Sequence, residues 1–168
     1  AGKYVTKEEA MKQRLDKAED EAKKDVYPLE KITTIVIEFL EKVGCENPVS
    51  LEIKNIADFL TPRIRSRKYN QLKEKYDLNN RKHLVWMKFT TDGYIGVVAA
   101  SDDINFDMDN TSGKIIDHLN KNWNQDFVLV FPLSNIGDKE RSDIECGIGN
   151  YLIDKDVPIL DFYSHQYK

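Results

Sequence analysis

A carboxylate near the C-terminus, Glu145, has the sequence surroundings of a group that acts on a bound ligand. Residues 127–133 form a continuous apolar run, which predicts a buried strand, and a polar loop then leads into a helical pattern. In open α/β sheets ligands bind at the carboxyl ends of strands, and the first turn of a helix offers unpaired N–H groups to an anion. Glu145, a carboxylate one turn inside this helix, is therefore expected to point near the same crevice. The residues expected to bind the ligand beside it are Ser134, Asn135, Asp138 and Arg141.

The same segment resembles the C-terminal part of the nucleoside deoxyribosyltransferase family. The matching residues are Glu145-Cys146-Gly147-Ile148-Gly149 on the helix and Val157-Pro158-Ile159 on the strand that follows. The resemblance covers roughly a fifth of the chain. It implies a nucleoside- or nucleotide-binding enzyme for N-glycosyl transfer or hydrolysis, in which Glu145 is the nucleophile that attacks an anomeric carbon.

A simpler interpretation of these residues is structural. Arg141 lies four residues before Glu145 on one helical face, so the two side chains can form a surface ion pair. On this interpretation, Gly147 and Gly149 serve only to let the helix pack closely against the sheet.

The charge of the chain is distributed unevenly. Residues 62–82 carry eight cations and two anions, a charge of +6. Because the net charge of the whole chain is −4, the remaining residues together carry −10. A basic helix favours binding to nucleic acid, with cations on the phosphates and an aromatic ring on a base. The expected contacts are Arg63, Arg65, Arg67, Lys68, Tyr69 and Lys73. Two other interpretations stay open: the helix pairs with the protein's own acidic loop, or the acidic remainder binds a basic protein, such as a toxin that it neutralises.

Neither a metal nor a cofactor is expected. Four aspartates lie between positions 102 and 109, but they lack the glycine and glutamate of an EF-hand loop, and a turn before the next helix explains them. The three histidines are scattered singly, without the spacing of a zinc motif.

The elements that must position these residues follow from hydrophobic periodicity and from cap and turn residues. A capping box, Thr6-x-x-Glu9, predicts a helix from Lys7, and the most apolar helical stripe follows Pro28 and ends at Gly44. The remaining expectations are helices over 50–60, 63–76 and 112–122 and after 139, and strands over 84–89, 94–99, 127–133 and 157–162.

The order of these elements predicts one α/β or α+β domain over residues 1–168. A helical part, 27–80, would cover a small mixed sheet in 81–168 that contains a β-hairpin and a C-terminal parallel βαβ unit. Residues 1–26 would form a helical arm with a thin apolar stripe, through which the chain could form an oligomer.

Composition narrows the class of protein further. The chain has no apolar run of the ~18 residues that a membrane helix needs, and no signal-peptide pattern. Its two cysteines do not suggest a disulfide framework, so a cytoplasmic location is expected. No complete catalytic set is visible, which favours a non-catalytic binding protein for a macromolecular partner over the enzyme that the resemblance implies.

Overall fold

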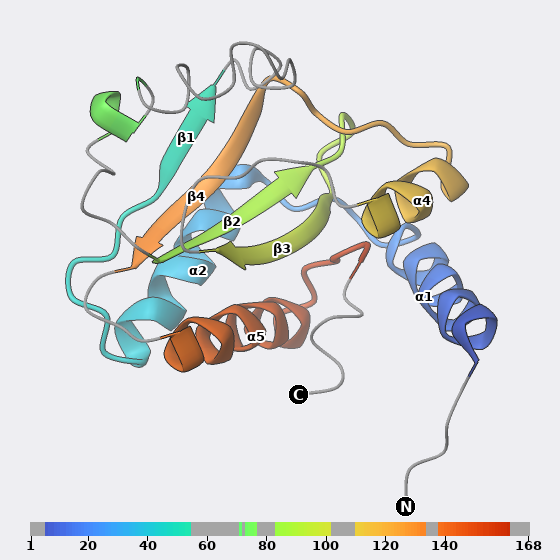
Figure 1. Ribbon diagram of the computed structural model, residues 1–168, viewed down its shortest axis with the longest axis horizontal. Helices are drawn as coiled ribbons and strands as arrows, with labels where there is room; N and C mark the ends of the chain where they lie inside the picture. Colours follow the sequence, from blue (N-terminus) through green and yellow to red (C-terminus); the bar gives the residue numbers. More distant parts are fainter. Residues whose placement is uncertain are drawn as a thin grey trace, which may run out of the picture.

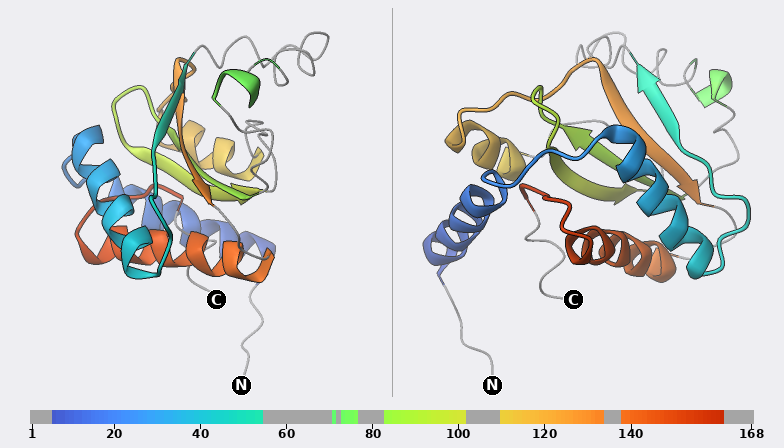
Figure 2. Two further views of the ribbon diagram at one scale, coloured as in Figure 1. Left: turned by 90° about the vertical axis from the view of Figure 1, so that its left-hand side faces the viewer. Right: turned by 180° about the vertical axis from the view of Figure 1, so that it is seen from behind.

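Two helices, α2 (Leu29–Lys42) and α5 (Asp138–Asp154), pack together against one face of a β-sheet in the computed structural model (Figures 1 and 2). The structure describes residues 6–54, 71, 73–76, 83–101, 110–133 and 138–161. The apolar stripe of α2 is buried as its periodicity predicts, with Ile32, Val36 and Leu40 in the main core. These two helices therefore position the C-terminal segment on the sheet.

Within the described residues the sheet has four strands in the order β1-β4-β2-β3, and all neighbouring pairs are antiparallel. The strands are β1 (Leu51–Lys54), β2 (His83–Phe89), β3 (Ile95–Ser101) and β4 (Phe127–Leu133). The expected hairpin is present as β2 and β3, and β4 has the predicted bounds. The expected class, α/β or α+β, is confirmed.

The C-terminal segment departs from the expected βαβ unit in its neighbours. After α5 the chain returns to the sheet beside β3, where Ile159 forms a parallel bridge with Ile95. The amides of Leu160 and Asp161 donate to the carbonyl oxygens of Ile95 and Gly96, each at 2.9 Å. Strands β2 and β3 therefore lie between this segment and β4, so the prediction of adjoining parallel strands is wrong. Both edges of β4 are occupied, by β1 and β2, so the returning chain cannot pair with β4 and lies instead along the outer edge of β3.

The prediction of a helix over residues 50–60 is also wrong at its start, because residues 51–54 form strand β1. Ile53 is fully buried and pairs with Val128, whereas Glu52 and Lys54 are exposed. Apolar and polar residues thus alternate with the period of two that a half-buried strand requires. Residues 55–60 lie outside the described part of the chain.

Helix α1 (Lys7–Glu21) begins with the predicted capping box and lies beside α4 (Asn110–His118) (Figure 1). Thr6 Oγ1 accepts from the amide of Glu9 at 3.1 Å, and the Glu9 carboxylate accepts from the amide of Thr6 at 3.4 Å. Only Ala18 and Glu21 of this helix are buried. Most of α1 is therefore held to the domain by a few polar contacts rather than by a core.

One of these contacts is a buried ion pair that joins α1 to the C-terminal segment. Arg14 donates to both carboxylate oxygens of Asp161, at 3.2 and 2.6 Å, and Ser112 of α4 also donates to Asp161. Asp161 is 4% exposed and Arg14 15% exposed. Since a buried carboxylate needs its charge and lone pairs satisfied, these three residues bind α1, α4 and the last described residues to one another.

None of the helices in the described part of the chain has the length and apolar character needed to cross a bilayer.

Candidate functional site

Three segments of the described chain meet at one end of the sheet. Strand β4 ends at Leu133, which is paired with His83 at the start of β2, and β3 ends at Ser101, which is paired with Leu84. Helix α5 begins at Asp138, five residues after Leu133 in sequence. This end of the sheet is the place where the sequence predicts a ligand site.

A polar contact at this end of the sheet joins Arg141 to His83. Arg141 in the first turn of α5 approaches His83 Nδ1 to 3.1 Å, and His83 is 8% exposed. Because a guanidinium group only donates hydrogen bonds, Nδ1 is the acceptor in this contact. The sequence alone did not reveal this partner of Arg141, since the two residues meet only through the pairing of β2 with β4.

Glu145 lies one helical turn after Arg141. The spacing of Arg141, Glu145, Ile148 and Leu152 places them along one stripe of α5, and both Ile148 and Leu152 are fully buried. Glu145 itself is half-buried. The helix therefore places the predicted reactive carboxylate on the same side as the Arg141–His83 contact.

Other predicted site residues fall outside this description. Ser134 and Asn135 are not among the described residues, and Asp138 is described only as the first residue of α5. The structure thus places Glu145 and Arg141 on one helix and adds His83 to them.

Gly147, which belongs to the motif behind the family resemblance, has a clear packing role. A Cβ atom at this position would stand 2.4 Å from Cζ of Phe39 on α2. The Phe39 ring also lies against Tyr151, with centroids 5.4 Å apart. The absence of a side chain at Gly147 therefore lets α5 approach α2 closely. The sequence predicts a packing role for this glycine, but against the sheet, whereas its neighbour in the structure is α2.

Cys45, just after α2, is not a good nucleophile. Burial raises the pKa of its thiol, and the negative charge of Glu140 in α5 raises that pKa further. The reactive thiolate is therefore disfavoured at neutral pH.

The described part of the basic segment, residues 71 and 73–76, is attached to the sheet through Tyr76. Residues 73–75 are helical, and the hydroxyl of Tyr76 donates to the carbonyl oxygen of Glu52 on β1 at 3.4 Å. The Tyr76 ring packs against the cluster of Ile53, Leu84 and Trp86 on the face of the sheet opposite α2. Lys73 is half-buried and Lys75 is exposed, with its Nζ 5.4 Å from the centre of the Tyr76 ring. The other expected nucleic-acid contacts, Arg63, Arg65, Arg67, Lys68 and Tyr69, lie outside the described residues.

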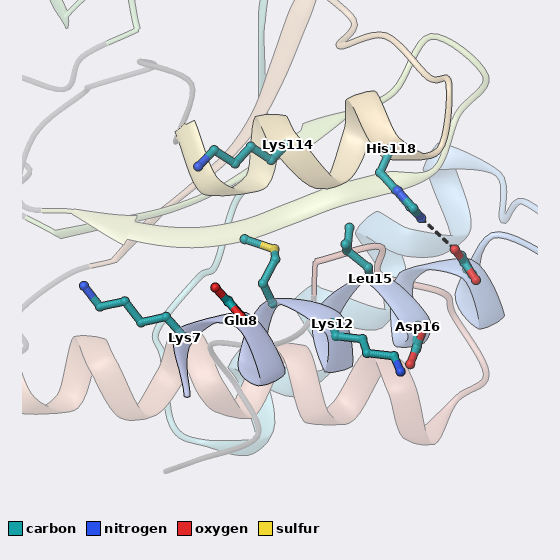
Figure 3. A pocket seen from close by; sticks show the side chains of 9 residues that line it. Lys7, Glu8, Lys12, Leu15, Asp16, Lys114 and His118 are labelled. Atoms are coloured by element: carbon teal, nitrogen blue, oxygen red, sulfur yellow. Dashed lines mark hydrogen bonds and ion pairs between the residues drawn. The ribbon is translucent and has the colours of Figure 1, made fainter. Parts of the chain in front are cut away.

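A groove of about 630 Å³ runs between α1 and α4 (Figure 3). Its floor includes the half-buried Met11 and Leu15, and Leu15 points toward α4. At one end His118 of α4 contacts Glu19 of α1, with Nε2 and Oε1 2.6 Å apart. Sequence reasoning marked α1 as a thinly packed helix but gave no indication that α4 would lie beside it.

The described residues contain no group of three or more His, Cys, Asp or Glu side chains close enough to hold a metal ion. The acidic stretch 102–109 lies outside the described residues.

Comparison with protein-family models, with curated proteins and with solved structures finds no match to the chain. The resemblance to nucleoside deoxyribosyltransferases therefore stays a prediction from the residues of the C-terminal segment.

Proposed function

We propose that this chain is a non-catalytic binding protein that holds a nucleic acid through the basic segment 62–82. The observation that supports the proposal is the attachment of this segment to the sheet at Tyr76. A charge of +6 within 21 residues gives the segment a strong attraction for phosphates.

The attachment matters because the cost of ordering a flexible chain on binding is subtracted from the affinity. The partly buried ring of Tyr76 attaches this part of the segment to the sheet, and Lys75 next to it is exposed. Lys73 and Lys75, the described cations of the segment, thus lie next to a point of attachment on the sheet. Each cation that neutralises a phosphate releases condensed counterions, so binding should depend steeply on salt.

Fluorescence anisotropy with labelled RNA and DNA, single-stranded and duplex, tests the proposal. We expect log K to fall linearly with log salt concentration, by about 0.7 to 0.9 for each phosphate neutralised. A triple charge reversal in the segment should abolish measurable binding. The control reverses three exposed lysines elsewhere and changes the net charge equally. The test variant carries Arg63→Glu, Arg65→Glu and Arg67→Glu, and the control carries Lys23→Glu, Lys31→Glu and Lys155→Glu.

Two results would contradict the proposal. Salt-independent binding would show that phosphate contacts do not drive it, and equal losses in the two triple variants would show that net charge alone matters. A chain that binds no nucleic acid but binds a basic protein would favour the acidic remainder as the binding surface.

The second candidate is the nucleoside- or nucleotide-binding enzyme with Glu145 as nucleophile. The observation that favours it is the Arg141–His83 contact, one helical turn from Glu145 at the end of the sheet. A guanidinium group there is suited to an anionic group of a nucleotide. The absence of a parallel neighbour beside β4 removes the crevice between adjacent parallel strands, so this candidate ranks second.

Incubation of the protein with deoxynucleosides and free bases, followed by chromatography, tests this candidate. We expect base exchange or hydrolysis in the wild type and its loss in Glu145→Gln. Asp143→Asn, an exposed carboxylate on the same helix, is the matched control and should retain activity. An inactive wild type, or an active Glu145→Gln, would remove the candidate.

A further inference from the structure

The groove between α1 and α4 has opposite charges at its two ends. At the end near the start of α1, Lys7, Glu8 and Lys114 leave a charge of +1. At the other end, Lys12 extends toward Asp16 (Figure 3), and together with Asp16 and Glu19 it leaves a charge of −1 when His118 is counted as neutral. All of these side chains are exposed.

Between the two charged ends lies an apolar strip. Met11 and Leu15 are half-buried, one helical turn apart, and line the groove together (Figure 3). A charged rim around an apolar strip is the pattern of a docking surface for a helix.

We propose that this groove binds α1 of a second copy of the chain, in an antiparallel arrangement about a two-fold axis. The charges are self-complementary: rotation by 180° brings the negative end of one groove onto the positive end of the other. In an isologous interface the same patch serves both partners, which a groove with +1 at one end and −1 at the other allows. The inference goes beyond the proposed function, because it does not involve the basic segment.

The register follows from the spacing along α1. When the two antiparallel α1 helices are aligned so that position 13 of each lies at the same level, Met11 lies opposite Leu15 of the partner subunit, and the two apolar strips meet. The same register places Lys7 opposite Glu19 of the partner subunit. Lys12 then lies within one turn of Asp16 of the partner subunit.

A helix from an unrelated partner is a weaker fit. It would need the same alternation of charge in the reverse direction, which a second copy supplies by symmetry. Helix α1 also has little burial of its own, with only Ala18 and Glu21 enclosed, so an antiparallel pair would give it a second packing partner.

Sedimentation velocity over a wide range of protein concentrations tests the proposal. We expect the wild type to shift from monomer to dimer as concentration rises, and to shift back when salt is added, because the paired charges are exposed. Gln13→Glu, on an exposed face of α1 outside the groove, is the control and should sediment as the wild type does.

Two charge-reversal variants make the test specific. Asp16→Lys with Glu19→Lys makes both ends of the groove positive, and Lys7→Glu with Lys12→Glu makes both ends negative. Each variant alone should stay monomeric, and an equimolar mixture should form the heterodimer. Recovery on mixing also shows that both variants are folded.

A wild type that stays monomeric at every concentration would overturn the proposal. So would a mixture of the two variants that shows no heterodimer while circular dichroism shows native helix content in each. Dimers in either variant alone would show that the contact lies on another surface.

Discussion

Replacement of Gly147 by alanine tests how α5 is seated against α2. The alanine Cβ would stand 2.4 Å from Cζ of Phe39, and 3.1 and 3.2 Å from the two Cε atoms. Carbon atoms in contact prefer about 3.5–4.0 Å, so the ring or the helix must move by about 1 Å or more. The ring cannot turn freely, because its other neighbour is Tyr151. We expect this clash to destabilise the fold.

The size of the effect follows from two opposing terms. Overpacking of this kind costs about 1–3 kcal/mol, whereas alanine in a helix is favoured over glycine by about 1 kcal/mol. Gly113 in α4 supplies a reference, since a Cβ there meets nothing within 4 Å. Gly113→Ala should therefore be neutral or stabilising, and the difference between the two variants in free energy of unfolding should be about 1–3 kcal/mol.

Urea denaturation, followed by circular dichroism, measures both variants. Adding Phe39→Leu to Gly147→Ala should recover part of the loss, because a smaller side chain leaves room for the new methyl group. The double-mutant cycle should give a favourable coupling between the two substitutions. If Gly147→Ala stabilises the protein as much as Gly113→Ala does, the close contact with Phe39 does not exist and the glycine has another role.

Two further predictions concern carboxylates. Asp161→Asn should lower the free energy of unfolding by about 3 kcal/mol, because it leaves the partly buried guanidinium of Arg14 without its charged partner. Asp20→Asn is the control, since its ion pair is about three-quarters exposed, and it should change the free energy of unfolding by less than about 0.5 kcal/mol. Equal effects of the two substitutions in urea denaturation would contradict the buried pair. Burial raises the pKa of Asp92, but hydrogen bonds from Lys121 and Thr90 outweigh it and hold that pKa below its ordinary value. A lowered folded-state pKa contributes stability above the unfolded-state value, about 3.9, and this contribution is lost as pH falls through the folded-state pKa. Asp92→Asn should therefore melt below the wild type at neutral pH and approach it in acid, and a constant difference in melting temperature across the acid range would refute this assignment.

Features that depend on neighbouring residues in sequence could be predicted from the sequence. The capping box places the start of α1 at Lys7, and the apolar run fixes β4 as Phe127–Leu133. Gly44 has a φ of 88°, a conformation that glycine adopts without strain, so α2 ends where its periodicity indicates. Strand β1 was missed because four alternating residues are too short to distinguish a strand from the first turn of a helix.

Features that depend on which strands become neighbours could not be predicted in this way. The chain leaves β4 through α5 and would return beside it in a simple βαβ unit, but β1 and β2 already occupy both its edges. The same pairing of β2 with β4 brings His83 to Arg141, although 58 residues separate them. A lone histidine in the sequence therefore becomes part of the candidate site only once the order of the strands is known.

Helix α1 shows how a local pattern can indicate an interaction without naming the partner. Its thin apolar stripe predicts that the helix has little core of its own, and the structure agrees, with two buried residues. The stripe does not say that Arg14 is held by Asp161, nor that α4 forms the second wall of a groove. Once both are in place, Met11 and Leu15 have an apolar surface that the domain only half covers, and charges of opposite sign flank it. The thin apolar stripe and the many charges of α1, which predict a weakly packed helix from sequence, are thus the features that favour a symmetric contact between two copies.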